Sequence, residues 1–237
     1  MNRRQLLKLL PVATAAGALL KVSGRTLAAE IPAMSRESQR NMTPEQALSA
    51  LKDGNERFVN GRMLHRNLMA QVRATASGQY PFAVVLGCID SRVPPELVFD
   101  QGIGDIFSPR IAGNFASTDI IGSIEFATKL SGAKAVVVLG HTECGAVRGA
   151  CDNVRLGNLT HTLSNISPAV YAVKDICDDR TSKNKAFVQK VADENVRLTV
   201  QALTERSAVL KELAVENQLT LVGAMHDVAT GRVSFLG

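Results

Sequence analysis

Two short apolar runs stand out in the pattern of hydrophobic and polar positions along the chain. Residues 82–86 and residues 135–139 are rich in valine, contain no charged side chain and are each followed by a glycine. Continuous apolar runs of this length are typical of buried strands in a parallel sheet that is covered on both faces. We therefore predict that they are neighbouring strands in the core of one sheet.

Other strands and helices alternate with these two runs. Strands are expected near 105–111, at 219–222 and at 232–236, and long helical patterns cover 117–129 and 164–213. The second of these patterns has a candidate break at Lys183-Asn184. The alternation predicts an α/β fold: a mostly parallel four-stranded sheet with an added edge strand, flanked by helices.

Two helix starts are marked by their local sequence. Thr43 is predicted to cap a helix that has Pro44 at its first position and Gln46 three residues after the cap, which is a capping box. Pro94-Pro95-Glu96 predicts a short helix, because the first turn tolerates proline and deeper positions do not.

Chemically reactive side chains follow both valine-rich runs. Cys88 comes directly after the first run and its glycine, whereas His141 and Cys144 follow the second. The carboxyl ends of adjacent parallel strands are about 4.8 Å apart, so these three side chains are expected to converge. Two thiolates and an imidazole are ligands typical of tetrahedral zinc, with the fourth position left to Asp90 or to water.

The residues around these positions resemble a known family. Cys-x-Asp-Ser-Arg at 88–92 and His-x-x-Cys at 141–144 form the signature of the β-class carbonic anhydrases, and the chain is similar to that family from about Thr43 to its end. Five further blocks occur in the family's order: Ser91-Arg92-Val93-Pro94, Gly104-Asp105-Ile106-Phe107, Arg110-Ile111-Ala112-Gly113-Asn114, Ser123-Ile124-Glu125-Phe126-Ala127 and 223–231. The resemblance implies a single catalytic domain over 43–237.

The resemblance also implies an activity and a cofactor. It implies reversible hydration of carbon dioxide to bicarbonate and a proton by a zinc-bound hydroxide, with one Zn²⁺ per chain on Cys88, His141 and Cys144. The Asp90–Arg92 dyad would assist. In the family this aspartate is either held off the zinc by the arginine or occupies the fourth position itself, which closes the site. The sequence leaves both arrangements open.

Three further residues match family positions at the substrate site. Gln79 corresponds to a glutamine that hydrogen-bonds the substrate, and Phe107 and Phe126 to residues that line an apolar pocket. Gly145, at a helix start, would allow close backbone approach, and we include it among the substrate-binding residues. Taken alone, Gln79 also fits an exposed loop and the two phenylalanines fit ordinary core packing.

The resemblance implies a homodimer or a dimer of dimers, because the family builds its site at a dimer interface. Some members that close their site keep a tryptophan where this chain has Val85, which weakens the expectation of regulation by bicarbonate, although Arg110 can still serve an anion. Three histidines, His65, His161 and His226, receive no role.

Two alternative functions remain. Relatives with this fold hydrolyse carbonyl sulfide or carbon disulfide, and a permanently ligated Asp90 would make the zinc site structural and the protein non-catalytic. A cysteine-dependent phosphatase is excluded, because the arginine it needs six residues after its nucleophile is replaced by Pro94 after Cys88 and by Ala150 after Cys144. A redox dithiol is disfavoured because the chain has His-x-x-Cys rather than Cys-x-x-Cys.

The positive charge of the chain is concentrated at its amino terminus. Of the 237 residues, 46% are hydrophobic, which suffices for one sizeable core, and the net charge is +5. Five basic residues precede residue 30, and the rest of the chain has as many basic as acidic residues, 22 of each. The charge therefore gives no indication of a nucleic-acid partner.

Residues 1–29 are predicted to be a twin-arginine-type export signal and 30–42 a linker. Arg3-Arg4 precedes an apolar stretch of twelve residues, which is shorter than the roughly twenty that cross a bilayer. Cleavage near Ala28 or Ala29 would remove the apolar stretch, so that no stable membrane anchor remains. The mature protein is then expected to be exported, to the periplasm. The remaining cysteines, Cys151 and Cys177, are expected to be buried free thiols, with a disulfide between them as the alternative.

Overall fold

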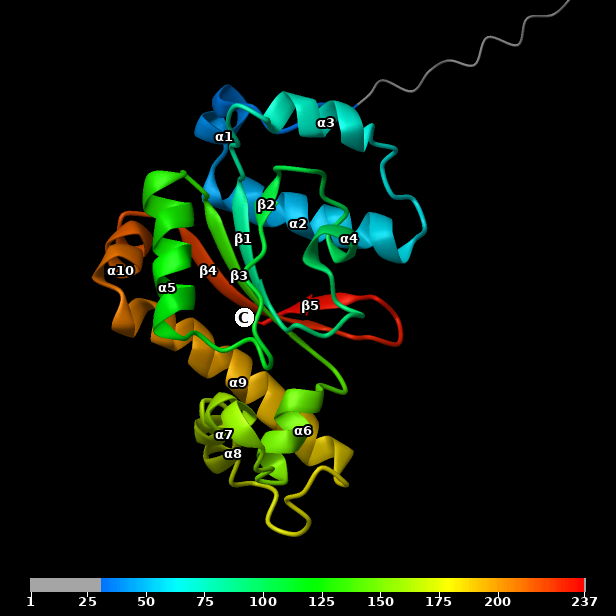
Figure 1. Cartoon of the computed structure of the whole chain (residues 1–237), viewed down its shortest axis with the longest axis vertical. Helices are drawn as coiled ribbons and strands as arrows, with labels where there is room; N and C mark the ends of the chain where they lie inside the picture. The colour runs from blue at the N-terminus through cyan, green and yellow to red at the C-terminus, as the bar shows by residue number, and fades with distance from the viewer. Residues whose placement is uncertain (1–30, 237) are drawn as a thin grey trace, which may run out of the picture.

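A computed structural model of the protein describes residues 31–236. A five-stranded sheet forms its centre, in the order β2-β1-β3-β4-β5, with helices packed against both faces (Figure 1). The strands are β1 (Ala83–Gly87), β2 (Ile106–Phe107), β3 (Ala135–His141), β4 (Thr220–His226) and β5 (Val233–Phe235). The first four are parallel and β5 is antiparallel to β4, which confirms the predicted sheet with its added edge strand.

The two valine-rich runs are β1 and β3, and they are paired in register. Ala83 lies beside Ala135 and Gly87 beside Leu139, and every residue of both strands is buried. Because β3 is also paired with β4, both of its edges are occupied. The carboxyl ends of β1, β3 and β4 therefore meet at one edge of the sheet.

Each face of the sheet has its own apolar core. Alternate residues of β1 and β3, such as Val85 and Val137, pack under α2 (Pro44–Val59) and α4 (Pro95–Val98). The intervening residues, such as Val84 and Val136, pack under α5 (Thr118–Glu125), α9 (Lys185–Arg206) and α10 (Ala208–Val215). Figure 1 shows α2 on one side of the sheet and the long helix α9 crossing the other. This alternation follows from the two-residue period of strands.

The helices form where capping and apolar periodicity favour them. They are α1 (Arg36–Asn41), α2 (Pro44–Val59), α3 (Leu68–Thr75), α4 (Pro95–Val98), α5 (Thr118–Glu125), η1 (Phe126–Leu130), α6 (Gly145–Cys151), α7 (Gly157–Ser164), α8 (Ser167–Ala172), α9 (Lys185–Arg206) and α10 (Ala208–Val215). The capping box at Thr43 is confirmed, and so is the short helix after Pro94. No helix within residues 31–236 combines the length and the apolar character that crossing a bilayer requires.

Three predicted elements differ in extent. The strand near 105–111 is reduced to β2 with a further bridge between Gly87 and Arg110, because Pro109 has no N–H for the ladder. The helix expected at 117–129 becomes π-helical from Phe126. The helical region expected at 164–213 consists of three helices, α8, α9 and α10, separated by a loop over 173–184 and by Ser207. The break predicted at Lys183-Asn184 is confirmed, because Asn184 caps the start of α9.

The segment before α2 is only partly described. Residues 36–41 of the predicted linker form α1, and the buried Gln39 donates hydrogen bonds to the carbonyl oxygens of Pro81 and Ser131, which attach α1 to the domain. The predicted export signal at 1–29, with its cleavage site, lies outside the described residues.

Candidate metal centre

Cys88, His141 and Cys144 meet at the carboxyl edge of the sheet. Cys88 directly follows β1, His141 is the last residue of β3, and Cys144 is the N-cap of α6. One ligand atom from each, two sulfurs and an imidazole nitrogen, all lie within 4.8 Å of one another. The convergence predicted from the strand pattern is therefore confirmed.

The imidazole of His141 is oriented toward this cluster. Its Nδ1 lies 2.9 Å from the carbonyl oxygen of Thr142, so the proton on Nδ1 is donated there and Nε2 keeps its lone pair. Nε2 is buried and has no hydrogen-bond partner among the described residues. A buried acceptor without a partner is costly, and a metal ion between Nε2 and the two sulfurs would remove that cost. The donor set thus fits zinc.

The two sulfurs compete for one proton. A hydrogen bond with Cys144 is the largest cause that lowers the pKa of the Cys88 thiol, to about 4, and the amide of Gly113 adds a hydrogen bond to the Cys88 sulfur at 3.3 Å. The same shared proton raises the pKa of Cys144. A divalent cation would displace this proton, because metal ligation deprotonates cysteine.

Asp90 is paired with Arg92 beside the cluster. Arg92 donates from Nε to Oδ1 at 2.9 Å and from its terminal nitrogen to Oδ2 at 2.7 Å, which is bidentate geometry. These bonds are the largest cause that holds the pKa of Asp90 well below its usual range. Asp90 Oδ2 is 4.0 Å from His141 Nε2, and Asp90 does not belong to the three-residue cluster.

One side chain and one backbone turn hold the ligand loops in place. Arg110, which the sequence suggested for an anion, donates to the carbonyl oxygens of Cys88 at 2.7 Å and of Asp90 at 2.6 Å. Glu143 has φ 54, in the left-handed region, and so bends the chain between the ligands His141 and Cys144. Its carbonyl oxygen also accepts a hydrogen bond from Arg92 at 3.3 Å.

The structure does not bring Gln79 to the metal centre of its own chain. Gln79 precedes β1 and lies in a surface pocket with Arg36 and Lys129, whereas Cys88 follows β1. The five residues of β1 therefore separate Gln79 from the cluster by roughly 15 Å or more. Any contact between Gln79 and a metal centre requires a second copy of the chain.

The other predicted substrate residues lie in two places. Phe107 and the half-exposed Phe126 stack edge to face, with ring centroids 6.3 Å apart, in a pocket of about 750 Å³ that none of the candidate metal ligands lines. Gly145 follows Cys144 directly. A Cβ at Gly145 would meet no atom within 4 Å, so the space beside this backbone is open.

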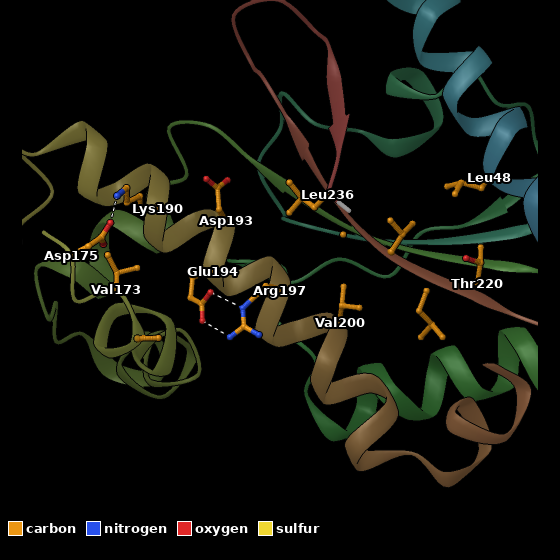
Figure 2. Close-up of a pocket in the computed structure, with 14 residues that line it drawn as sticks. Leu48, Val173, Asp175, Lys190, Asp193, Glu194, Arg197, Val200, Thr220 and Leu236 are labelled. Carbon is orange, nitrogen blue, oxygen red and sulfur yellow. Dashed lines mark hydrogen bonds and ion pairs between the residues drawn. The ribbon is translucent and has the colours of Figure 1, made fainter. Parts of the chain in front are cut away.

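A pocket of about 850 Å³ lies away from the metal centre, between α9 and strand β4 (Figure 2). Its lining includes two ion pairs, Asp175 with Lys190 and Glu194 with Arg197, and apolar side chains such as Leu221 and Leu236. No cysteine or histidine lines it.

Sequence analysis gave Gly113 and His226 no role in the site. His226 lies beside His141 in register; it is 2% exposed, and neither ring nitrogen has a partner among the described residues. Burial lowers the pKa of His226. The sequence could have indicated His226 as a site residue, because it follows a predicted strand, as His141 does. All four cysteines are free, so the alternative of a disulfide between Cys151 and Cys177 is not found. Cys177 is exposed and Cys151 is half-buried, so the expectation that both are buried was wrong.

Comparison with known proteins gives the family. A family model described as carbonic anhydrase matches residues 83–233. A solved β-carbonic anhydrase of Aspergillus fumigatus has a TM-score of 0.62 and 28% identity, covering 81% of this chain and 89% of its own. The chain belongs to the β-carbonic anhydrase family. The α/β fold and the enzyme class predicted from the sequence agree with that membership.

Named relatives of this β-carbonic anhydrase cover nearly all of the domain. Carbonic anhydrase 2 of Mycobacterium tuberculosis is 38% identical over 198 residues, which span 81% of this chain and 92% of the relative. A carbonic anhydrase of Mycolicibacterium smegmatis is 35% identical over 199 residues, which span 81% of this chain and 93% of the relative. One of two tetrameric β-carbonic anhydrases of Sordaria macrospora has a TM-score of 0.62 and 29% identity, covering 70% of this chain and 85% of its own.

Proposed function

We propose that this β-carbonic anhydrase hydrates carbon dioxide reversibly to bicarbonate and a proton, with one zinc ion per chain held by Cys88, His141 and Cys144. The observation that carries the proposal is the cluster itself: one imidazole nitrogen of His141 and the two sulfurs lie within 4.8 Å of one another, and the buried Nε2 of His141 has no hydrogen-bond partner among the described residues. When bound, zinc supplies an acidified water, whose pKa falls from about 15.7 to about 7 in a carbonic anhydrase with three histidine ligands.

Asp90 is proposed to orient the reacting water as a hydrogen-bond acceptor. Its carboxylate lies beside the cluster, 4.0 Å from His141 Nε2, and Arg92 holds it in a bidentate pair. Because that pair lowers the pKa of Asp90, the carboxylate stays ionised at neutral pH. The same pair turns Asp90 away from ligation, which favours an open, catalytic site over a closed structural one.

Arg92 and Arg110 are proposed to preserve this geometry during turnover. Arg92 connects Asp90 to the carbonyl oxygen of Glu143, and Arg110 holds the carbonyl oxygens of Cys88 and Asp90. The two ligand loops are thereby fixed relative to each other before substrate arrives. Such preorganisation lowers the barrier, since no reorganisation is needed during the reaction.

We further propose that the active unit is a homodimer or a dimer of dimers. Gln79 lies at the far end of β1 from its own metal centre, so a role in substrate binding requires the site of a second subunit. Leu68, Met69 and Val72 on α3 are also exposed, which is typical of a surface that packs against another chain. The Sordaria macrospora relatives are described as tetrameric.

Export through the twin-arginine route is likewise a proposal. It rests on Arg3-Arg4 and the short apolar stretch after them. Sequencing the amino terminus of mature protein from a native host tests it: a start near residue 29 or 30 is expected, and a mature protein that begins at Met1 would contradict it.

Stopped-flow hydration of carbon dioxide between pH 7 and 9, on protein with measured zinc content, tests the activity. We expect rates proportional to zinc and rising toward alkaline pH, because two thiolates reduce the charge that acidifies the water. The same preparation should be assayed with carbonyl sulfide and carbon disulfide. Zinc-loaded protein that hydrolyses these and leaves carbon dioxide at the uncatalysed rate would contradict the proposal.

A further inference from the structure

A polar side chain interrupts the buried face of α9 close to the metal centre. Asn195 is 3% exposed and lies among the buried residues Val191, Ala192 and Val196. Val196 packs directly on the sheet, since a Cβ on Gly140 would lie 2.5 Å from its Cγ2. Burying an amide in such a place is unfavourable unless it is hydrogen-bonded.

The side chain of Asn195 is hydrogen-bonded to a turn that leads to a candidate metal ligand. Its Nδ2 donates to the carbonyl oxygen of Gly113 at 2.8 Å, across 82 residues of sequence. The amide of Gly113 in turn donates to the sulfur of Cys88 at 3.3 Å. Both polar groups of Gly113 are therefore engaged, one by α9 and the other by the candidate ligand.

The turn that contains Gly113 has little freedom to move. Asn114 donates its amide to the carbonyl oxygen of Ile111 at 2.9 Å, and Gly113 occupies the third position of this turn with φ 84, as a type II turn requires. A Cβ on Gly113 would lie 2.4 Å from Ile166 Cδ1, and a φ of 84 is strained for residues with a side chain, so glycine is favoured at this position. Ile166 packs against this turn, and Asn195 is hydrogen-bonded to its carbonyl group at Gly113.

We propose that Asn195 is a positioning residue for the metal centre, holding the turn at Gly113 so that its amide donates to the Cys88 thiolate. The inference rests on the proposed zinc site. An N–H bond to a ligating sulfur withdraws electron density from it, and the cation then keeps more of its charge. This counteracts the loss of acidity that two thiolate ligands cause. Partners of ligating residues typically change metal affinity or activity by about 10–100-fold.

The alternative role of Asn195 is only to satisfy a buried carbonyl group and stabilise the fold. Asn55 provides a matched control for that role. It is also 3% exposed; its Nδ2 donates to the carbonyl oxygens of Val98 at 3.0 Å and Gly231 at 2.9 Å, and its Oδ1 accepts from the amide of Val233 at 2.8 Å. It belongs to α2, on the opposite face of the sheet, and these three bonds reach none of the ligand loops. Substitutions of Asn55 should therefore cost at least as much stability as those of Asn195 and, unlike them, leave the metal unaffected.

The experiment compares Asn195→Asp and Asn195→Leu with Asn55→Asp and Asn55→Leu, as cobalt-substituted and as zinc-loaded full-length protein. In the Asn195 variants we expect the thiolate-to-cobalt charge-transfer band to move to longer wavelength, because the sulfur becomes a better electron donor. Zinc affinity, measured by competition with a chelator, should change by about 10-fold. The Asn55 variants should keep the wild-type band and affinity although their unfolding midpoint falls by as much or more.

Two results overturn the inference. One is a folded Asn195 variant with the band position and zinc affinity of the wild type. The other comes from wild-type protein loaded with ¹¹³Cd and requires no variant: a scalar coupling between ¹¹³Cd and the Gly113 amide proton through the Cys88 sulfur is expected, and its absence contradicts the hydrogen bond. If wild-type protein binds neither zinc nor cobalt, the proposed function fails instead.

Discussion

Two buried polar clusters of this β-carbonic anhydrase differ in what their neighbours supply. The carboxylate of Asp100 is fully buried and accepts hydrogen bonds from Arg57 and Arg66, each at 2.5 Å, and from the amide of Leu64. The cluster of Cys88, His141 and Cys144 is equally buried, but His141 Nε2 has no partner among the described residues and its two sulfurs share a proton.

The difference separates structural stabilisation from ligand binding. Asp100 joins α2, the loop after it and the end of α4, and its own chain supplies the compensating charge. In the metal cluster the two sulfurs share a proton and His141 Nε2 has no partner among the described residues, so a cation from outside the chain would complete it. Removing a partner should therefore mainly lower the free energy of unfolding in the Asp100 cluster and mainly lower metal affinity in the cluster of Cys88, His141 and Cys144.

The largest effect is expected from Cys144→Ser. Residues that only contact a ligand change affinity by about 10–100-fold, so loss of a ligand should weaken zinc binding by more than about 100-fold and reduce hydration to the background rate. Zinc content by atomic absorption and stopped-flow assays measure this. Cys177→Ser, which changes an exposed free thiol, is the control and should keep both. A Cys144→Ser protein with full zinc content would remove Cys144 from the ligand set.

Asp100→Asn should lower the free energy of unfolding by about 3 kcal/mol, because it leaves two arginines next to a neutral group. Urea denaturation of zinc-loaded protein measures the change. The rate per bound zinc should stay within about twofold of wild type. A variant with normal stability and low activity would reverse the distinction between the two clusters.

Asp90→Asn and Arg92→Ala should retain zinc and lose about 100-fold in turnover, the size of a general acid–base contribution. The pKa of Asp90 is lowered in the folded state, so stability from its pair with Arg92 is present above the ordinary value near 3.8 and is lost only as pH falls below it. The pair should therefore contribute nothing to the pH dependence between 6 and 9. Near-normal turnover in both variants would exclude it from the mechanism.

The smallest effect concerns Asp193, in the pocket of Figure 2, whose carboxylate accepts one hydrogen bond from Gln189 at 2.9 Å. Burial raises its pKa, so its favourable contribution is full below about pH 3.8 and is lost as pH rises through the folded pKa. Asp193→Asn should thus stabilise the protein at pH 7 by less than about 1 kcal/mol and have no effect at pH 3. Thermal unfolding at the two pH values tests this; destabilisation at pH 7 would mean that the charge is favourable.

Local pattern was sufficient for the centre of the molecule. Valine-rich runs ending in glycine identify buried strands, and adjacent parallel strands bring their carboxyl ends together, so the positions of Cys88, His141 and Cys144 predicted their convergence. The capping box at Thr43 and the cap at Asn184 were predictable because they depend on neighbours three residues away.

Only the tertiary structure decided which partners lie around these ligands. Gln79 is nine residues from Cys88, yet β1 places it at the opposite end of the sheet, and Asn195 reaches the Cys88 turn from 82 residues beyond Gly113. Arg57 and Arg66 likewise meet Asp100 across 43 and 34 residues. Strand and helix periodicity specifies which side of an element a residue occupies, whereas contacts between distant elements depend on how those elements pack, which no local pattern contains.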